Sequence, residues 1–231
     1  MKTQKEKQDT NKLFKIAYLK YNRLIENGSF YLNLITDEDL KVLDTEDRWS
    51  LHCTHVKENI NSHTNWVNIF TWVLCKKQGY DEAKTGRALT FSTFHDFDEI
   101  FTGDLNHKFK YDFDNGVDIE QVKKYAQKKV KEKLMSFGIS KEDIRSTFTV
   151  EDEIKLLVKL ADWLSALQFL SFELFLGNNT LKVKKDFVYC LIGVCKAIQD
   201  FSVCKNIEET DSDLARLFLD LRKINNLLYG G

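Results

Sequence analysis

The stretch that decides the fold is EDEIKLLVKLADWLSALQFLSFELFL, residues 151–176. Apart from its charged start it is nearly all apolar, so we predict one long buried helix, with the following Gly177, Asn178 and Asn179 as its C-terminal stop. Asp162 stands in the middle of this run. A carboxylate there is costly unless it is ion-paired or bound to a metal, and ion pairing is the commoner case. The stretch therefore predicts a core helix that carries one functional or paired acid.

Helical patterns continue on both sides of this stretch. An apolar side chain recurs every three or four positions at Ile119, Val122, Ala126, Val130, Leu134 and Phe137. Further helices are predicted at residues 13–25, 61–77, 81–101, 182–204 and 212–229, and the polar residues 104–118 are expected to form a long loop. In the helix that Asn61 or Ser62 would cap, the inner face is expected to be Trp66, Ile69, Phe70 and Val73. In the next helix the expected apolar stripe is Leu89, Phe94, Phe97 and Phe101.

Composition favours an all-α fold. The chain of 231 residues has no Pro and only 10 Gly, whereas strand-rich sandwiches and barrels need frequent turn residues. Hydrophobic residues make up 43%, enough for a real core, and the length suits one domain with an appendage. The net charge of −1 argues against a dedicated nucleic-acid binder. We predict a single helical bundle.

Compartment and redox state follow from the same composition. The N-terminus has no apolar signal segment, and the longest apolar run, residues 187–195, is shorter than a membrane span. The five Cys are odd in number and form no C-x-x-C pair, so neither a disulfide framework nor a thiolate zinc site is indicated. We expect reduced thiols in a cytoplasmic protein without a membrane partner.

The segment FHDFDEIFTGD, residues 94–104, carries the chemistry. His95 and Asp96 are adjacent on a predicted helix, and Glu99 would rise from the same face one turn later. Imidazole and carboxylate ligands suit a divalent transition metal. His63 and Asp162 could complete a site of two His and two Asp, although His63 taken alone is more often a surface or capping residue.

The order of motifs along the chain adds weight to this interpretation. Arg48 and Trp49 come first, then E-N-x-x-x-H ending at His63, then H-D-x-x-E-x-x-T-G-D-L from His95 to Leu105, then Ala161 and Asp162. This order resembles the HD-domain phosphohydrolases and, more narrowly, the bacterial 5′-deoxynucleotidases and related phage dATP triphosphohydrolases. The resemblance covers about residues 46–180. It implies an N-terminal helical extension at residues 1–45 and an HD-type domain at residues 46–231, built around a divalent metal site.

The resemblance also implies roles for individual residues. One divalent metal, Mn, Co, Fe or Zn, would be held by His63, His95, Asp96 and Asp162. Glu99 would orient or deprotonate the attacking water, Asp104 would handle a proton on the leaving oxygen, and Arg48 would hold the phosphate. Trp49 would pack on the deoxyribose. Substrate contacts would extend to Leu105, Asn106, His107 and Lys110, beside His63, Asp96 and Asp162. The loop after T-G-D-L departs from the family because it lacks prolines.

The function implied is hydrolysis of 2′-deoxyribonucleoside 5′-monophosphates to deoxyribonucleoside and phosphate. The alternatives are a dATP-like triphosphohydrolase of the same superfamily and a non-catalytic nucleotide-binding helical protein. The expected partner is a deoxynucleotide and not a nucleic acid polymer. The relatives also lead us to expect a homo-oligomer, dimer or larger. The expected location is the cytoplasm, which is that of the host cell if a phage encodes the chain.

Overall fold

The computed structural model describes Val42 and residues 47–49, 54–102 and 119–204, all within the unit Val42–Gly231. Their regular secondary structure is helical apart from one short strand pair, so the predicted all-α class is confirmed. The helices predicted at residues 13–25 and 212–229 and the loop predicted at 104–118 lie outside the described residues. The domain boundary at residues 45 and 46 stays a prediction.

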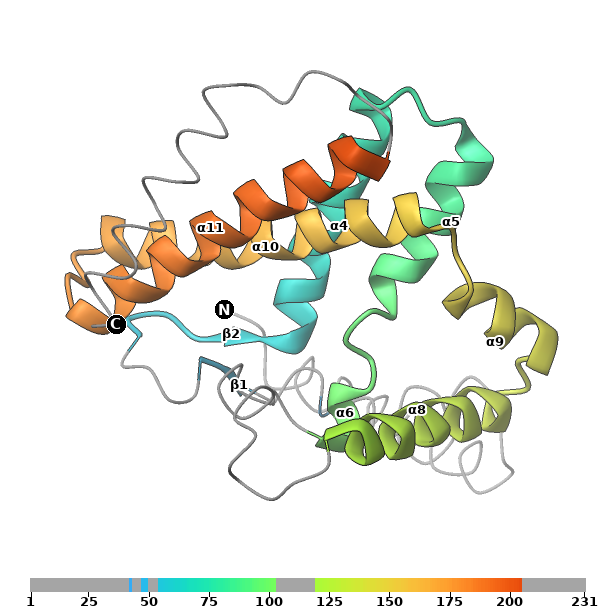
Figure 1. Ribbon diagram of the computed structural model, residues 1–231. Helices are drawn as coiled ribbons and strands as arrows, with labels where there is room; N and C mark the ends of the chain where they lie inside the picture. The colour runs from blue at the N-terminus through green and yellow to red at the C-terminus, as the bar shows by residue number, and fades with distance from the viewer. Residues whose placement is uncertain (1–41, 43–46, 50–53, 103–118, 205–231) are drawn as a thin grey trace, which may run out of the picture. The chain divides into compact units, whose positions relative to one another are not determined.

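The elements follow one another in a simple order (Figure 1). The strands β1 (Asp47–Arg48) and β2 (Glu58–Asn59) pair antiparallel, with Arg48 opposite Glu58. The helices are α4 (Ile60–Lys77), α5 (Glu82–Thr93), α6 (Glu99–Thr102), α8 (Ile119–Ser136), α9 (Lys141–Phe148), α10 (Asp152–Phe175) and α11 (Leu181–Cys204).

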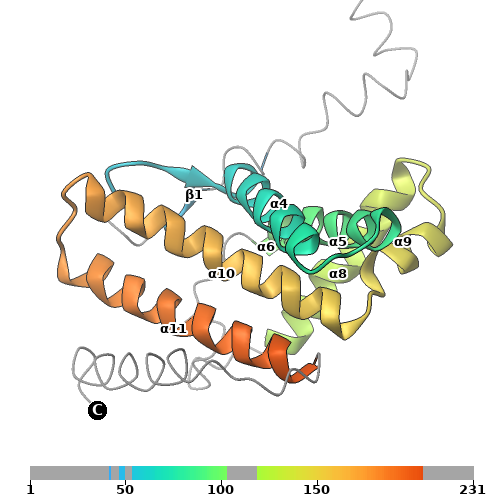
Figure 2. The same ribbon diagram turned by 90° about the horizontal axis from the view of Figure 1, so that it is seen from above.

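Helix α10 is the central element and matches the predicted buried helix to within one residue at each end. It packs along α11, which lies beside it in both views, and α4 crosses its N-terminal half (Figure 2). Its buried Leu157 and Ala161 join Val67 of α4 in the main core cluster. On its other side Leu160 packs with Val194 of α11. Helix α10 therefore contributes side chains to both packing interfaces.

Helix α4 begins earlier than predicted and buries a different face. Its N-cap is Asn59, whose side chain accepts from the backbone N–H of Ser62 while the Ser62 hydroxyl accepts from the N–H of Asn59. The buried side chains are Ile60, His63, Val67, Thr71 and Cys75. The predicted inner face was wrong, because Trp66, Ile69 and Val73 are exposed and Phe70 is half-buried.

The helix predicted over residues 81–101 is broken in two. Asp81 caps α5, which ends at Thr93, and turns over residues 94–98 lead into the short α6. Backbone bonds from Phe97 to Phe94 and from Glu99 to Asp96 close these turns. His95 and Asp96 therefore lie in a turn and not on a helix. Of the predicted stripe, Phe97 is buried and Leu89, Phe94 and Phe101 are partly covered.

Helix α8 confirms the periodic pattern, since Ala126, Val130 and Leu134 are buried. Helix α9 was not predicted; Ser140 caps it by accepting from the N–H of Asp143. By length and composition α11 could cross a membrane, although its buried residues pack against α10. The described cysteines are free thiols, and those of α4 and α11 other than Cys204 are buried.

Candidate metal centre and active site

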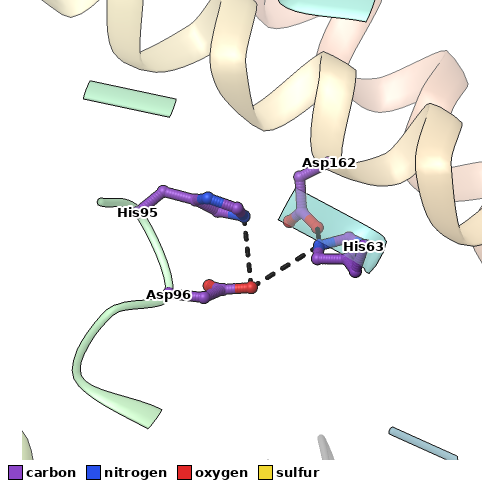
Figure 3. Close-up of side chains that lie close together, drawn as sticks. All are labelled: His63, His95, Asp96 and Asp162. Atoms are coloured by element: carbon purple, nitrogen blue, oxygen red, sulfur yellow. Dashed lines mark ion pairs between the residues drawn. The ribbon is translucent and has the colours of Figure 1, made fainter. Parts of the chain in front are cut away.

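Four side chains from distant parts of the chain meet at one point (Figure 3). They are the predicted set His63, His95, Asp96 and Asp162, and one ligand atom of each lies within 4.8 Å of the others. Asp96 Oδ2 lies 3.1 Å from His95 Nε2 and 3.5 Å from His63 Nε2, and Asp162 Oδ1 lies 3.2 Å from His63 Nε2. Opposite ligands of one metal ion lie about 4.2 Å apart when each bond is about 2.1 Å. The three separations of 3.1–3.5 Å lie below this limit, so small side-chain shifts would bring all four atoms onto one ion.

His63 is oriented from the facing helix. It is the fourth residue of α4, fully buried, and its Nδ1 lies 2.9 Å from the Ser165 hydroxyl of α10. When Nδ1–H donates to that hydroxyl, the lone pair of Nε2 faces the two aspartates, and Nε2 is the atom that could bind a metal. Ser165, on the facing helix α10, thus sets both the orientation of the His63 ring and its tautomer.

His95 is oriented by the end of α5. Its Nδ1 lies 2.6 Å from the carbonyl oxygen of Ser92, to which it donates, so Nε2 points at the cluster. The Ser92 hydroxyl in turn donates to Asn68 of α4. Burial alone would lower the pKa of His95, but the negative charge of the adjacent Asp96 outweighs burial and raises the pKa to about 9. Breaking the helix at Phe94 lets the ring and the next carboxylate face the same point.

Asp162 forms an ion pair and also faces the candidate metal ligands, the two roles that its sequence position left open. Its Oδ2 accepts from Lys159 Nζ at 2.6 Å, while Oδ1 faces His63. Burial alone would raise the pKa of Asp162, but the positive charge of Lys159 and the neighbouring His63 ring lower it. The carboxylate is therefore ionised in the apolar helix, paired on one oxygen and directed at the cluster with the other.

The donor set fits a divalent cation. The buried Nε2 atoms of His63 and His95 have no hydrogen-bond partner in the described part of the chain. Two ionised aspartates lie beside them and offer oxygen ligands to a cation. Two imidazoles and two carboxylates form a ligand set for first-row transition metals. This cluster could hold one divalent metal ion.

Arg48 faces the same cluster from β1. Its Nε and Nη1 are buried and have no hydrogen-bond partner among the residues described. Burial alone would lower the pKa of Arg48, but Asp96, Glu58, Asp162 and Glu99 together raise it, so the side chain stays charged. Buried guanidinium N–H groups next to a metal-ligand cluster are suited to bind an oxyanion.

Trp49 lies directly after β1 and is held from two sides. Its indole stacks on Phe169 of α10 with ring centroids 5.5 Å apart and planes 10° from parallel. Its Nε1–H donates to Glu58 Oε2 at 2.9 Å. Its backbone has φ +62°, the left-handed region that non-glycine residues rarely adopt. The ring is thus a fixed apolar surface beside Arg48.

Glu173 fixes the segment that leads into β2. Its fully buried carboxylate accepts from the backbone N–H groups of His55 and Val56 and from the Asn178 side chain, each at 2.8 Å. Asp162, Ser165, Phe169 and Glu173 follow one another at three- and four-residue steps, so they share one face of α10. One face of α10 therefore contacts four parts of the site. Asp162 is a candidate ligand, Ser165 contacts His63, Phe169 stacks on Trp49, and Glu173 binds the segment before β2.

The remaining predicted residues are placed as follows. Glu99 is the first residue of α6 and is buried, 5% exposed, close enough to Arg48 to raise its pKa. Asp104, Leu105, Asn106, His107 and Lys110 lie outside the described residues. The sequence analysis missed Glu58, Ser165, Phe169 and Glu173. The last three follow Asp162 in steps of three, four and four residues, and this helical spacing is the one signal that could have placed them on the same face of α10.

Comparison with known proteins identifies the family of this chain. A family model described as 5′-deoxynucleotidase YfbR-like matches residues 38–197, well over half of the chain. A solved structure of an HD-domain phosphohydrolase from Listeria innocua has the same fold, with TM-score 0.54 and 15% identity over 77% of this chain and 86% of that one. Among curated proteins none matches. The chain is a hydrolase of the HD-domain superfamily and belongs to the YfbR-like 5′-deoxynucleotidase family.

Proposed function

We propose that the protein is a 5′-deoxynucleotidase that hydrolyses 2′-deoxyribonucleoside 5′-monophosphates to deoxyribonucleoside and phosphate. The observation that carries the proposal is the charged Arg48, whose buried Nε and Nη1 have no hydrogen-bond partner in the described structure and lie next to the His and Asp cluster. A phosphate oxygen is the natural acceptor for such a guanidinium. The family match supports the same substrate class.

In this proposal His63, His95, Asp96 and Asp162 hold one divalent metal, Mn, Co, Fe or Zn. Such an ion lowers the pKa of bound water and polarises a phosphoryl oxygen. Ser165 and Ser92 keep both imidazoles aimed at the ion, and Lys159 holds Asp162 in place.

The other residues act on the substrate. Arg48 binds the phosphate and offsets the charge that develops on its oxygens. The buried Glu99 takes the proton of the attacking water, and Asp104 supplies a proton to the leaving 5′-oxygen. Trp49 packs against the deoxyribose, where an added 2′-hydroxyl would be crowded and unpaired. Leu105, Asn106, His107 and Lys110 complete the nucleotide contacts.

Product analysis tests the proposal. Purified protein is incubated with dAMP, dGMP, dCMP, dTMP, their ribose counterparts and dATP, each with Mn²⁺ or Co²⁺, and products are resolved by ³¹P NMR. We expect inorganic phosphate from the deoxymonophosphates and little from the ribonucleotides. Triphosphate released from dATP, with no phosphate from dAMP, would overturn the proposal in favour of the triphosphohydrolase. Homo-oligomer formation and a cytoplasmic location remain predictions from the resemblance.

A further inference from the structure

Glu58 contacts the two residues to which the proposed function gives substrate recognition. It is buried, 4% exposed, although it belongs to a strand of only two residues. In the strand pair it stands directly opposite Arg48, and its Oε2 accepts from the indole N–H of Trp49 at 2.9 Å. Residues opposite each other in an antiparallel pair have Cβ atoms about 5 Å apart.

A buried carboxylate needs partners of this kind. Burying an ionised acid without compensation is among the costlier changes in a protein interior. Glu58 finds a positive charge in Arg48, whose pKa it helps to raise, and a neutral donor in Trp49. The same side chain therefore links the phosphate-binding group to the surface proposed for the sugar.

The Trp49 ring has little freedom in this arrangement. The left-handed backbone geometry of Trp49 is strained for a non-glycine residue and persists only where the surroundings enforce it. Phe169 supports one face of the indole by stacking, and Glu58 holds its edge by the hydrogen bond. Stacking alone permits the ring to slide or turn in its plane, whereas the bond to Nε1 fixes its direction.

We propose that Glu58 is a positioning residue that fixes the Trp49 indole and so sets the preference for deoxyribose over ribose. This inference rests on the proposed function. The indole excludes a 2′-hydroxyl only if it cannot move away, and an apolar pocket discriminates against an added hydroxyl by about 100-fold in kcat/KM. Removing Glu58 lets the indole move away and admits the ribonucleotide.

The first test is the ratio of kcat/KM for dAMP to that for AMP, because both substrates share the phosphate and general losses of activity cancel. We expect Glu58→Ala to lower this ratio about tenfold. Glu58→Gln keeps an oxygen that can accept from the indole and should retain most of the ratio. Trp49→Phe removes the donor and should match Glu58→Ala. The double variant Trp49→Phe/Glu58→Ala should lose no more selectivity than either single variant, because one interaction is removed twice.

The second test does not depend on activity. The chain has 4 Trp, so its ¹⁵N-labelled indole N–H groups give a small set of NMR signals, and Trp49→Phe identifies the one from Trp49. We expect Glu58→Ala to move that signal upfield and Glu58→Gln to leave it near its original position. The exposed Glu132→Ala on α8 is the matched control and should change neither the signal nor the ratio.

The outcomes separate the two claims. If the wild-type protein hydrolyses neither dAMP nor AMP, the proposed function fails, and with it the selectivity role, while the signal still reports whether Glu58 holds the indole. If the wild type prefers dAMP and Glu58→Ala keeps both the wild-type ratio and the wild-type signal, Glu58 has no positioning role. An altered signal with an unchanged ratio would also overturn the proposal, because it would separate ring position from sugar preference.

Discussion

The hydroxyl of Ser165 lies 2.9 Å from Nδ1 of His63, across the interface between α10 and α4. Both side chains are fully buried. Ser165 stands one turn of α10 after Asp162, so the helix that presents one candidate ligand also orients another. The relationship ties the packing of two core helices to the direction of an imidazole lone pair.

Ser165→Ala should therefore weaken metal binding without unfolding the protein. Loss of a partner that orients a histidine ligand typically costs 10–100-fold in metal affinity. Isothermal titration of the metal-free protein with Mn²⁺ measures it. Ser171→Ala, on the exposed side of the same helix, is the control and should bind like wild type. Equal affinities for the two variants would show that Ser165 does not orient His63.

Glu99→Gln should abolish most turnover while the metal stays bound. Glu99 is buried beside the cluster but outside the four candidate ligands, and loss of a general base costs about 10²–10⁴-fold in rate. Phosphate release from dAMP and metal content by elemental analysis are measured on the same sample. A fully active variant would remove Glu99 from proton transfer, and a metal-free one would make it a ligand.

Glu173→Gln should destabilise the protein in a pH-dependent way. Burial alone would raise the pKa of Glu173, but hydrogen bonds from Asn178 and the N–H groups of His55 and Val56 lower it. A carboxyl group with a lowered folded pKa stabilises the protein above its unfolded pKa of about 4.3, and that contribution disappears as pH falls through the folded pKa.

Urea unfolding at pH 7 should thus show a loss of about 1–3 kcal/mol for Glu173→Gln, because Gln puts a donor beside a backbone donor. The difference from wild type should shrink below about pH 4. The exposed Glu132→Gln should have little effect at either pH. A difference for Glu173→Gln that is constant from pH 7 to acid would contradict a role for the charge.

Gly193→Ala and Gly86→Ala should have opposite effects. A Cβ at Gly193 of α11 would lie 2.4 Å from Cδ2 of Trp163, the neighbour of Asp162 in α10, so the helices must separate at a cost of about 1–3 kcal/mol. A Cβ at Gly86 of α5 meets nothing within 4 Å, and the higher helix propensity of Ala should stabilise by up to about 1 kcal/mol. Thermal unfolding compares them; a stabilised Gly193→Ala would contradict the close packing.

The sequence predicts which face of a helix is buried where apolar residues form one clear stripe. The prediction fails where apolar residues occupy more than one face of the helix. The period of α8 leaves one choice, and its buried residues are those expected. Helix α4 has apolar side chains all round, and the polar His63 and Thr71 lie on its buried face. Hydrophobicity alone therefore predicts the wrong buried face of α4, because the polar side chain of His63 points inward toward the candidate metal site.

The same limit explains the broken helix and the missed supports. No Gly or Pro marks the break after Thr93, so the turn that presents His95 and Asp96 has no local signal. The two-residue strands are too short for a period of two. The candidate ligands were identified because their residue types are chemically distinctive and occur in the order typical of the HD-domain family, whereas Ser165 and Phe169 are ordinary residues that only the packing of α10 makes important.

The central claim is that one divalent metal on His63, His95, Asp96 and Asp162 is required for phosphate release. The most direct test measures bound metal and phosphate release from dAMP together, for wild type and Asp162→Asn, after chelation and after titration with Mn²⁺. Wild type should regain activity in proportion to metal bound, up to one ion per chain, and Asp162→Asn should lose both. Full activity of the chelated wild-type protein, or of Asp162→Asn without metal, would contradict the account.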